Sequence, residues 1–261
     1  MTPLESYIRK RLKRKKLLLM THAVVGYPSL DANMKMLEVM QQADADLVEL
    51  QMPFSEPTAD GPLFVRANQR ALGAGINREQ YFRFMQRAAA NFDFKILMMG
   101  YYNSAFQMGH EAFCATLAEY GASGFILADL PPEESGDLFQ LAAPHHLDPI
   151  ILMTPTTSTA RLHQLAQYAR GFIYCTARKG VTGSRTILDQ KLRAFLQRCR
   201  TATALPLALG FGLQSGADLR EIQGMVDIGV IGTALLAAWE QGGAEQYTAL
   251  LTELQSAVTS Q

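Results

Sequence analysis

Residues 17–51 read LLLMTHAVVGYPSLDANMKMLEVMQQADADLVELQ, and they contain the unit from which most of the chain is built. An apolar run starts at Leu17 and leads into the turn Gly26-Tyr27-Pro28. An amphipathic stretch then covers residues 32–43, and a second apolar run begins at Leu47. The apolar runs are too short for most helices and too continuously apolar for strands that face water. This pattern favours parallel strands covered by helices.

The same unit recurs along the chain about eight times. Apolar runs begin near Leu17, Leu47, Lys95, Gly124, Pro149, Phe172, Leu205 and Asp227. Amphipathic stretches between them cover residues 32–43, 80–90, 111–120, 133–142, 159–168, 189–200 and 216–225. The spacing of the apolar runs averages roughly 30 residues, which is the length of a βα unit.

Eight such units without a long linker predict an α/β protein with a single (β/α)8 TIM barrel. We expect residues 1–261 to form one domain, with an additional helix at the N-terminus. An open, doubly wound sheet is the structural alternative. The dinucleotide-binding version of that sheet needs a Gly-x-Gly-x-x-Gly after the first strand, and the sequence has none there.

Composition excludes several classes of protein. The chain has 261 residues, of which 48% are hydrophobic, and 24 basic side chains balance 24 acidic ones. This apolar fraction supports a substantial core and argues against disorder. A neutral chain is not expected to bind nucleic acid or a membrane through its overall charge. The three cysteines are widely spaced and form no metal or redox motif, which indicates reduced thiols in the cytoplasm.

The N-terminal segment carries a basic cluster from Arg9 to Lys16. Together with the apolar residues that follow, this cluster resembles a signal peptide. The apolar stretch is too short for one, however, and it runs into Gly26-Tyr27-Pro28 without a clear cleavage site. No other segment has enough uncharged apolar residues to span a membrane. We expect the basic cluster to be the solvated face of a leading helix rather than a nucleic-acid patch.

Polar residues follow the predicted strands where a barrel carries its chemistry, beyond the carboxyl ends. Residues 47–52 read LVELQM, and the alternation of a strand places Glu49 and Gln51 on the face opposite Val48, Leu50 and Met52. Both faces of a barrel strand are covered, so Glu49 should be at least partly buried, which suits a general acid or base. A structural carboxylate paired with Lys or Arg is the alternative. Asp60 follows on a proline-rich loop, where it is either a second functional carboxylate or a turn residue.

Glycines after the last three runs indicate an anion site. The motifs are Gly180-Val181-Thr182-Gly183, Gly210-Phe211-Gly212 and Gly232-Thr233-Ala234. Glycine lets backbone N–H groups approach a ligand closely, and barrels often bind phosphate in their last two loops. A short helix that begins near Gly232 or Thr233 would add its positive N-terminal end. No metal site is expected, because the adjacent His145-His146 should diverge at a helix end.

The stretch of residues 49–62, ELQMPFSEPTADGP, resembles the signature ELGxPFSDPxADGP of the tryptophan synthase α subunit family. Further matches follow in the family's order: Arg66-Ala67-Asn68, Arg70-Ala71-Leu72, Tyr101-Tyr102-Asn103, Ala128-Asp129-Leu130-Pro131, Gly180-Val181-Thr182-Gly183 and Gly210-Phe211-Gly212. The matches run from about Gly26 to Leu235. The family fold is a (β/α)8 barrel, in agreement with the independent count of repeats.

The resemblance implies a carbon–carbon lyase of tryptophan biosynthesis, which reversibly cleaves indole-3-glycerol phosphate to indole and glyceraldehyde 3-phosphate without a metal or organic cofactor. It implies that Glu49 supplies the acid/base function. Asp60 would accept a hydrogen bond from the indole N–H and stabilise the positive charge that develops there. The substrate-binding residues that it implies are His22, Tyr101, Tyr174, Thr182, Gly183, Phe211, Gly212, Gly232 and Thr233. When the second and sixth loops close over substrate, Thr182 would contact Asp60.

The resemblance also implies a partner. Family α subunits bind a pyridoxal-phosphate-dependent β subunit in an α2β2 heterotetramer, and the β subunit receives the indole. The loop of residues 53–62 and the loop around Asn103 would face that partner. We expect no binding to nucleic acid or to a membrane.

The chain departs from the family pattern at five positions, one of which, Thr233 in place of the phosphate-site serine, keeps the hydroxyl. Gln51 replaces a glycine on the same strand face as Glu49, where it could crowd the indole pocket or hydrogen-bond Glu49. His22 stands where an apolar ring often lines the pocket, and it could change substrate preference or pack as a neutral ring. Glu56 replaces an aspartate associated with communication to the β subunit, and Ala177 replaces a serine. These departures leave open a catalytically weak α-like subunit that mainly binds and activates a β partner. A different barrel enzyme acting on sugar phosphates is a more distant alternative.

Overall fold

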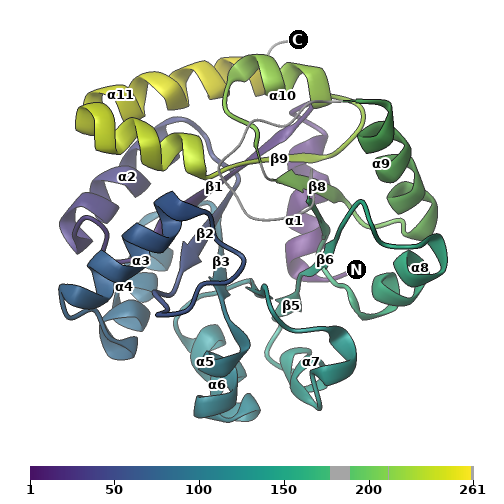
Figure 1. The fold of residues 1–261 in the computed structure, drawn as a ribbon, viewed down its shortest axis with the longest axis horizontal. Helices are drawn as coiled ribbons and strands as arrows, with labels where there is room; N and C mark the ends of the chain where they lie inside the picture. The colour runs from purple at the N-terminus through teal and green to yellow at the C-terminus, as the bar shows by residue number, and fades with distance from the viewer. Residues whose placement is uncertain (177–188, 211, 260–261) are drawn as a thin grey trace.

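The strands of this computed structural model are all parallel and wind into a nearly closed barrel (Figure 1). The structure describes residues 1–176, 189–210 and 212–259. The strands are β1 (Leu18–Val24), β2 (Leu47–Gln51), β3 (Lys95–Gly100), β4 (Gly124–Leu127), β5 (Asp148–Pro149), β6 (Ile151–Met153), β7 (Ile173–Thr176), β8 (Leu207–Gly210) and β9 (Ile228–Ile231). Their order around the barrel is β5-β4-β3-β2-β1-β9-β8-β7-β6.

The barrel predicted from the repeats is confirmed. Each of the predicted apolar runs overlaps a strand, and β5 and β6 together form the fifth strand, interrupted only at Ile150. On one side of this interruption β5 pairs with β4, and on the other side β6 pairs with β7. The nine strand segments therefore correspond to the eight predicted units.

Helices surround the barrel and also close one of its ends. They are α1 (Pro3–Leu12), α2 (Leu30–Gln42), α3 (Pro62–Gly73), α4 (Arg78–Asn91), α5 (Tyr102–Met108), α6 (His110–Glu119), α7 (Leu138–Ala142), α8 (Thr159–Tyr168), α9 (Gln190–Ala202), α10 (Gly216–Ile222) and α11 (Thr233–Thr259), with a 3-10 turn at Pro132–Glu134. Within the described residues, no helix is long and apolar enough to cross a membrane.

The amphipathic stretches mark most of these helices, with one clear difference. Residues 133–142 form only the 3-10 turn and the short α7, because the chain between them turns at Gly136, whose φ is +55°. A left-handed backbone conformation of this kind does not occur within a regular α-helix.

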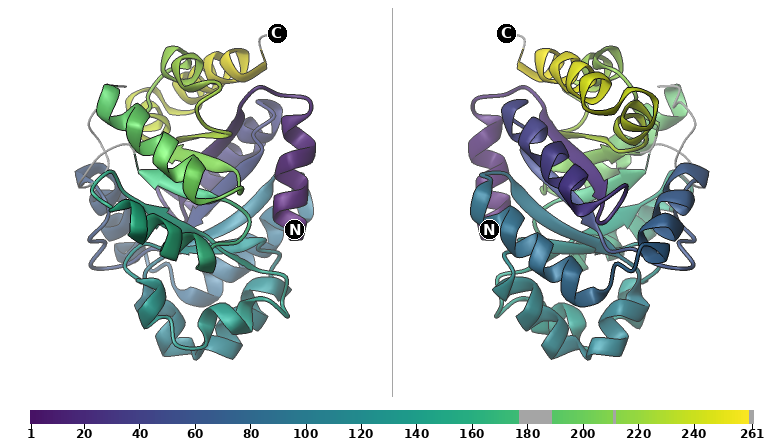
Figure 2. Two further views of the ribbon diagram at one scale, coloured as in Figure 1. Left: turned by 90° about the vertical axis from the view of Figure 1, so that its right-hand side faces the viewer. Right: turned by 90° about the vertical axis from the view of Figure 1, so that its left-hand side faces the viewer.

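Buried apolar side chains fill two main regions. The larger region lies between the strands and the outer helices, and it includes Val48 and Leu50 of β2. The second region occupies the inside of the barrel, where Leu47 joins residues such as Leu97 from other strands. Leu4 and Ile8 of α1 belong to this inner region, so α1 closes one end of the barrel. Figure 2 shows this helix at one edge of the molecule.

Part of the N-terminal basic cluster is directed inward. Asp46 is fully buried, and it accepts hydrogen bonds from Arg11 Nε at 2.5 Å, Lys15 Nζ at 2.9 Å and the backbone N–H of Leu19 at 2.9 Å. Asp44 also contacts both cations, at 2.5 Å from Arg11 and 2.9 Å from Lys15. The prediction of a solvated basic face is therefore wrong for Arg11 and Lys15, which anchor the N-terminal segment to the start of β2.

Candidate active site

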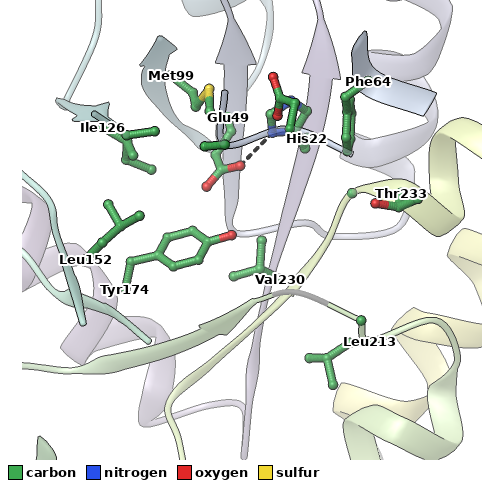
Figure 3. Close-up of a pocket in the computed structure, with 15 residues that line it drawn as sticks. His22, Glu49, Phe64, Met99, Ile126, Leu152, Tyr174, Leu213, Val230 and Thr233 are labelled. Atoms are coloured by element: carbon green, nitrogen blue, oxygen red, sulfur yellow. Dashed lines mark hydrogen bonds and ion pairs between the residues drawn. The ribbon is translucent and has the colours of Figure 1, made fainter. Parts of the chain in front are cut away.

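A cavity opens at the carboxyl ends of the strands, where a barrel of this kind carries its chemistry (Figure 3). Its walls are largely apolar, with a few polar groups pointing inward. The lining residues are His22, Glu49, Ala59, Asp60, Phe64, Met99, Ile126, Ala128, Leu152, Tyr174, Gly212, Leu213, Val230, Gly232 and Thr233. A few convergent polar groups in an apolar cavity are typical of a site for a small organic molecule.

The structure brings together many of the residues that the sequence singled out. The cavity lining includes the two carboxylates Glu49 and Asp60 and five further predicted site residues: His22, Tyr174, Gly212, Gly232 and Thr233. Tyr101 lies behind Asp60 and does not line the cavity. The predicted residues Thr182, Gly183 and Phe211, together with the departure at Ala177, lie outside the described residues.

Strand β2 directs Glu49 into the barrel. The alternation predicted for this strand is confirmed, because Leu47 joins the inner core whereas Val48 and Leu50 join the outer one. Glu49 is only 3% exposed. Its Oε2 lies 2.6 Å from His22 Nδ1, whereas its Oε1 is buried without a hydrogen-bond partner among the described residues. One carboxylate oxygen is therefore held by the protein, and the other is available to a ligand.

His22 is placed against Glu49 by the pairing of two strands. In the β1–β2 ladder, His22 lies opposite Glu49, and its Nε2 is 2.9 Å from Gln51 Oε1. The ring also packs edge-on against Phe64, with the centroids 4.7 Å apart. Burial alone would lower the pKa of His22, but the hydrogen bond and the charge of Glu49, with a further contribution from Asp60, raise that pKa above its usual value. The surroundings of this ring therefore favour its protonated form over a neutral ring that only packs.

Gln51 takes neither of the two positions expected for it. It is fully buried and absent from the cavity lining, and its hydrogen bonds in the described residues go to His22 and Asp60 rather than to Glu49. The larger side chain is therefore accommodated in the wall of the cavity, where it leaves the space in front of Glu49 open.

Asp60 is held by Gln51 at the end of β2 and by Tyr101 directly after β3. Its Oδ2 accepts hydrogen bonds from Gln51 Nε2 at 2.6 Å and from the Tyr101 hydroxyl at 3.2 Å. That hydroxyl in turn accepts from the backbone N–H of Ala59 at 3.1 Å, and Phe54 stacks on the Tyr101 ring. Burial raises the pKa of the Asp60 carboxyl, and the hydrogen bond from Gln51 and the positive charge of His22 offset this only in part. Tyr101 thus fixes the loop that carries Asp60.

Tyr174 on β7 directs its ring toward Glu49 (Figure 3). Burial, followed by the charges of Glu49 and Asp60, raises the pKa of this hydroxyl well above its usual value, so it stays protonated near neutral pH. A Cβ on Gly210 would overlap the Tyr174 hydroxyl oxygen. The glycine at this position, which the sequence analysis assigned to anion binding, thus also makes room for the tyrosine.

The opposite part of the cavity contains the start of a helix. Gly232 and Thr233 line the cavity, and α11 begins at Thr233, as the glycine motif predicts. Free backbone N–H groups and the positive end of the dipole make a helix N-terminus suitable for an anion. A Cβ on Gly232 would lie 3.2 Å from Phe64 and 3.3 Å from His22, so the backbone comes close to both rings. Among the described residues, no group of three or more His, Cys, Asp or Glu side chains is arranged to hold a metal ion.

The sequence analysis missed the apolar walls of the cavity, which include Phe64, Met99, Ile126, Leu152 and Val230. The strand register contains a signal for some of them. Met99 lies opposite Gln51 in the β2–β3 ladder and opposite Ile126 in the β3–β4 ladder. Inward positions at one level of a barrel form layers, so the level of the polar residues on β2 predicts which apolar residues surround them.

Comparisons with known proteins agree with this geometry. The profile of the family described as tryptophan synthase alpha chain matches residues 8–260. The tryptophan synthase alpha chain of Syntrophotalea carbinolica is 45% identical over 251 residues, which cover 96% of this chain and 99% of that protein. The alpha chain of Desulforapulum autotrophicum is 46% identical over 242 residues, which cover 93% of this chain and 96% of that one.

Solved structures give the same result. A chain of Mycobacterium tuberculosis tryptophan synthase matches with a TM-score of 0.92 and 28% identity, covering 100% of this chain and 99% of that one. The tryptophan synthase alpha chain of Legionella pneumophila matches with a TM-score of 0.86 and 27% identity, covering 98% of this chain and 97% of that one.

Proposed function

The chain belongs to the tryptophan synthase alpha chain family, and from this premise we propose how its residues carry out the lyase reaction of that family. The reaction is the reversible cleavage of indole-3-glycerol phosphate to indole and glyceraldehyde 3-phosphate, in tryptophan biosynthesis. The observation that supports the residue assignment is the presence of Glu49 and Asp60 in one apolar cavity at the carboxyl ends of the strands.

Cleavage of the carbon–carbon bond needs two proton transfers, one on each side of that bond. A proton must reach C3 of the indole, and a proton must leave the adjacent glycerol hydroxyl. We assign both transfers to Glu49, because its Oε1 is buried without a partner among the described residues. Glu49 first acts as an acid and then as a base, so it ends the cycle with the proton it began with.

Protonation of C3 places a positive charge on the ring nitrogen, and Asp60 is the group that stabilises this charge. The hydrogen bonds described above go to its Oδ2, and we assign Oδ1 to the indole N–H. Gln51 and Tyr101 hold the carboxylate in place before substrate arrives. A charge that is already oriented stabilises the intermediate without reorganisation during the reaction.

The remaining lining residues divide into an apolar part and an anion-binding part. Met99, Ile126, Leu152 and Val230 supply apolar surface that suits an indole ring. The N-terminus of α11, with Gly212, Gly232 and Thr233, suits the phosphate. The family resemblance assigns Tyr174 to the glycerol portion of the substrate. It also assigns Gly183 and Phe211 to the substrate site and Thr182 to a contact with Asp60, and these three residues lie outside the described residues.

Membership of the family implies a β subunit partner. We propose the α2β2 assembly, with residues 53–62 and the loop around Asn103 facing the β subunit. Asn103 lies in α5 rather than in a loop, and Phe106 on the same helix is 62% exposed and offers an apolar contact there. The three cysteines are free and buried, which is compatible with the reducing cytoplasm that we propose as the location.

Turnover of indole-3-glycerol phosphate by the purified chain, alone and mixed with a β subunit, tests this function. We expect indole release by the chain alone and faster release in the mixture. Undetectable cleavage in both preparations, with stimulation of the β subunit intact, would instead favour the catalytically weak activator. We favour the lyase because Gln51 is buried in the wall and does not line the cavity.

A further inference from the structure

The two carboxylates of the site are joined by an unbroken chain of hydrogen bonds through His22 and Gln51, two of the positions at which this chain departs from its family. Glu49 Oε2 lies 2.6 Å from His22 Nδ1, and His22 Nε2 lies 2.9 Å from Gln51 Oε1. Gln51 Nε2 then donates to Asp60 Oδ2 at 2.6 Å. All four side chains are buried, with at most 8% of any residue exposed. With so little of these side chains exposed, the direction of each hydrogen bond in the network is determined mainly by the donors and acceptors of these four residues.

The direction of the hydrogen bonds follows from the chemistry of the amide. Asp60 Oδ2 already accepts from the Tyr101 hydroxyl, and an ionised carboxylate has no proton to donate to Gln51. Gln51 therefore presents its NH2 group to Asp60 and its carbonyl oxygen to His22. A carbonyl oxygen can only accept, so His22 Nε2 must carry a proton. Nδ1, which points at Glu49, is then the ring nitrogen that can gain or lose one.

One proton consequently lies between His22 Nδ1 and Glu49 Oε2. It is held on the ring, as an imidazolium beside a carboxylate, because, despite burial, the hydrogen bond and the charge of Glu49 raise the pKa of His22. Among the described residues, the titratable groups that face His22 are Glu49 and Asp60, and Tyr101 and Tyr174 are the nearby hydroxyls of the site. Burial raises the pKa of both tyrosines, so they add no charge near neutral pH.

Given the proposed lyase function, we propose that His22 is a positioning residue that keeps one proton at Glu49, and that Gln51 fixes the tautomer in which it does so. The pair supplies the proton that Glu49 delivers to C3 of the indole. The glycerol hydroxyl returns a proton to the pair as the carbon–carbon bond breaks, and the electron pair of that bond moves into the ring and neutralises the nitrogen. The proton count of the pair is restored after each cycle.

The first test is a nuclear magnetic resonance titration of 15N-histidine-labelled protein between pH 5 and 9, without substrate. The His22→Gln variant identifies the His22 signals. In the wild type we expect Nε2 to stay protonated throughout, and Nδ1 to titrate with a midpoint above the ordinary histidine value of about 6.5. In Gln51→Met, which keeps the volume of the side chain but removes the acceptor oxygen, Nε2 should no longer stay protonated over the whole pH range. A wild-type neutral ring with its proton on Nδ1, or a midpoint that is not raised, would overturn the proposal.

The second test is the pH profile of kcat/KM for cleavage. Activity needs the shared proton, so it falls on the basic side as the pair loses it. In His22→Gln this basic limb should move to lower pH by at least about one unit, which is a tenfold loss at the alkaline end. His163→Gln, a matched change at an exposed histidine on α8, should keep the wild-type profile.

The two tests separate the failure of this inference from the failure of the proposed function. Wild-type turnover with an unchanged profile in His22→Gln overturns the role of His22. Absence of wild-type turnover at every pH overturns the lyase assignment, whereas the titration still decides whether Gln51 fixes the tautomer of His22.

Discussion

Replacing Asp46 with asparagine should strongly destabilise the protein, because this carboxylate anchors the N-terminal segment to the barrel. Asp46 is fully buried and neutralises both Arg11 and Lys15, at 2.5 and 2.9 Å. It also accepts the backbone N–H of Leu19 at 2.9 Å, where β1 runs beside the start of β2. The Asp46→Asn substitution would keep the shape of the side chain and one acceptor oxygen but would lose the charge.

The size of the effect follows from what is left behind. Removing one partner of a buried ion pair costs about 3–5 kcal/mol, because the remaining charge stays buried without compensation. The Lys15 side chain is only 5% exposed, but that of Arg11 is 23% exposed, and Asp44 still contacts both cations. We therefore expect the lower part of this range, about 3 kcal/mol. Folded domains are stable by only about 5–15 kcal/mol, so this loss is easy to measure.

Urea unfolding followed by circular dichroism measures the loss as a lower midpoint at constant slope. Glu79→Gln is the matched control, because its ion pair with Arg83 is 71% exposed on both sides and should contribute less than about 0.5 kcal/mol. Adding Lys15→Met to the Asp46 variant removes one buried charge and should recover part of the stability. A loss below about 1 kcal/mol, or no recovery in the double variant, would refute the reasoning.

Three further substitutions test the packing and the site. Gly124→Ala should lower the free energy of unfolding by about 2 kcal/mol or more, because the new Cβ would overlap the backbone oxygen of Asp148. In the same urea unfolding experiment Gly73→Ala, whose Cβ meets nothing within 4 Å, should cause no loss. Burial raises the pKa of Asp148 from 3.8 to about 6, so its carboxyl destabilises the fold progressively as pH rises between these values. Asp148→Asn should therefore be more stable than the wild type above pH 6 but not at pH 4. Equal differences in stability at both pH values would contradict this. Gly210→Ala should displace the Tyr174 hydroxyl, which the new Cβ would overlap, and lower kcat/KM for cleavage at least about tenfold in steady-state kinetics. An unchanged kcat/KM would show that the position of this ring is not needed.

The sequence predicts the barrel well because the evidence for it is local. Strand alternation places Glu49 inside the barrel from five residues of β2, and the spacing of apolar runs predicts the units without knowledge of contacts. The sequence analysis misses the helix α3, because it begins at Pro62, directly after a loop rich in proline and glycine. The sequence predicts a short helix near Thr233. In the structure, α11 continues to Thr259, past the non-helical residues Gly242 and Gly243.

The polar network of the site could not be predicted in the same way, because it depends on register. The sequence places His22 and Gln51 near the site through family resemblance, but it does not say which side chains they contact. The parallel ladder that sets His22 opposite Glu49, and the loop geometry that brings Asp60 within 2.6 Å of Gln51, are long-range properties of the fold. The two alternatives for Gln51, crowding of the pocket and contact with Glu49, are wrong for this reason.

Cleavage of indole-3-glycerol phosphate by the Glu49→Gln variant tests the central claim most directly. The amide keeps the size of the side chain but can neither give nor take the proton, so turnover should fall by at least about a hundredfold. The variant should still unfold cooperatively and still bind inorganic phosphate as the wild type does. Loss of turnover with the fold and phosphate binding retained is the predicted result, and wild-type turnover in this variant would contradict the assignment of Glu49 as the acid and base.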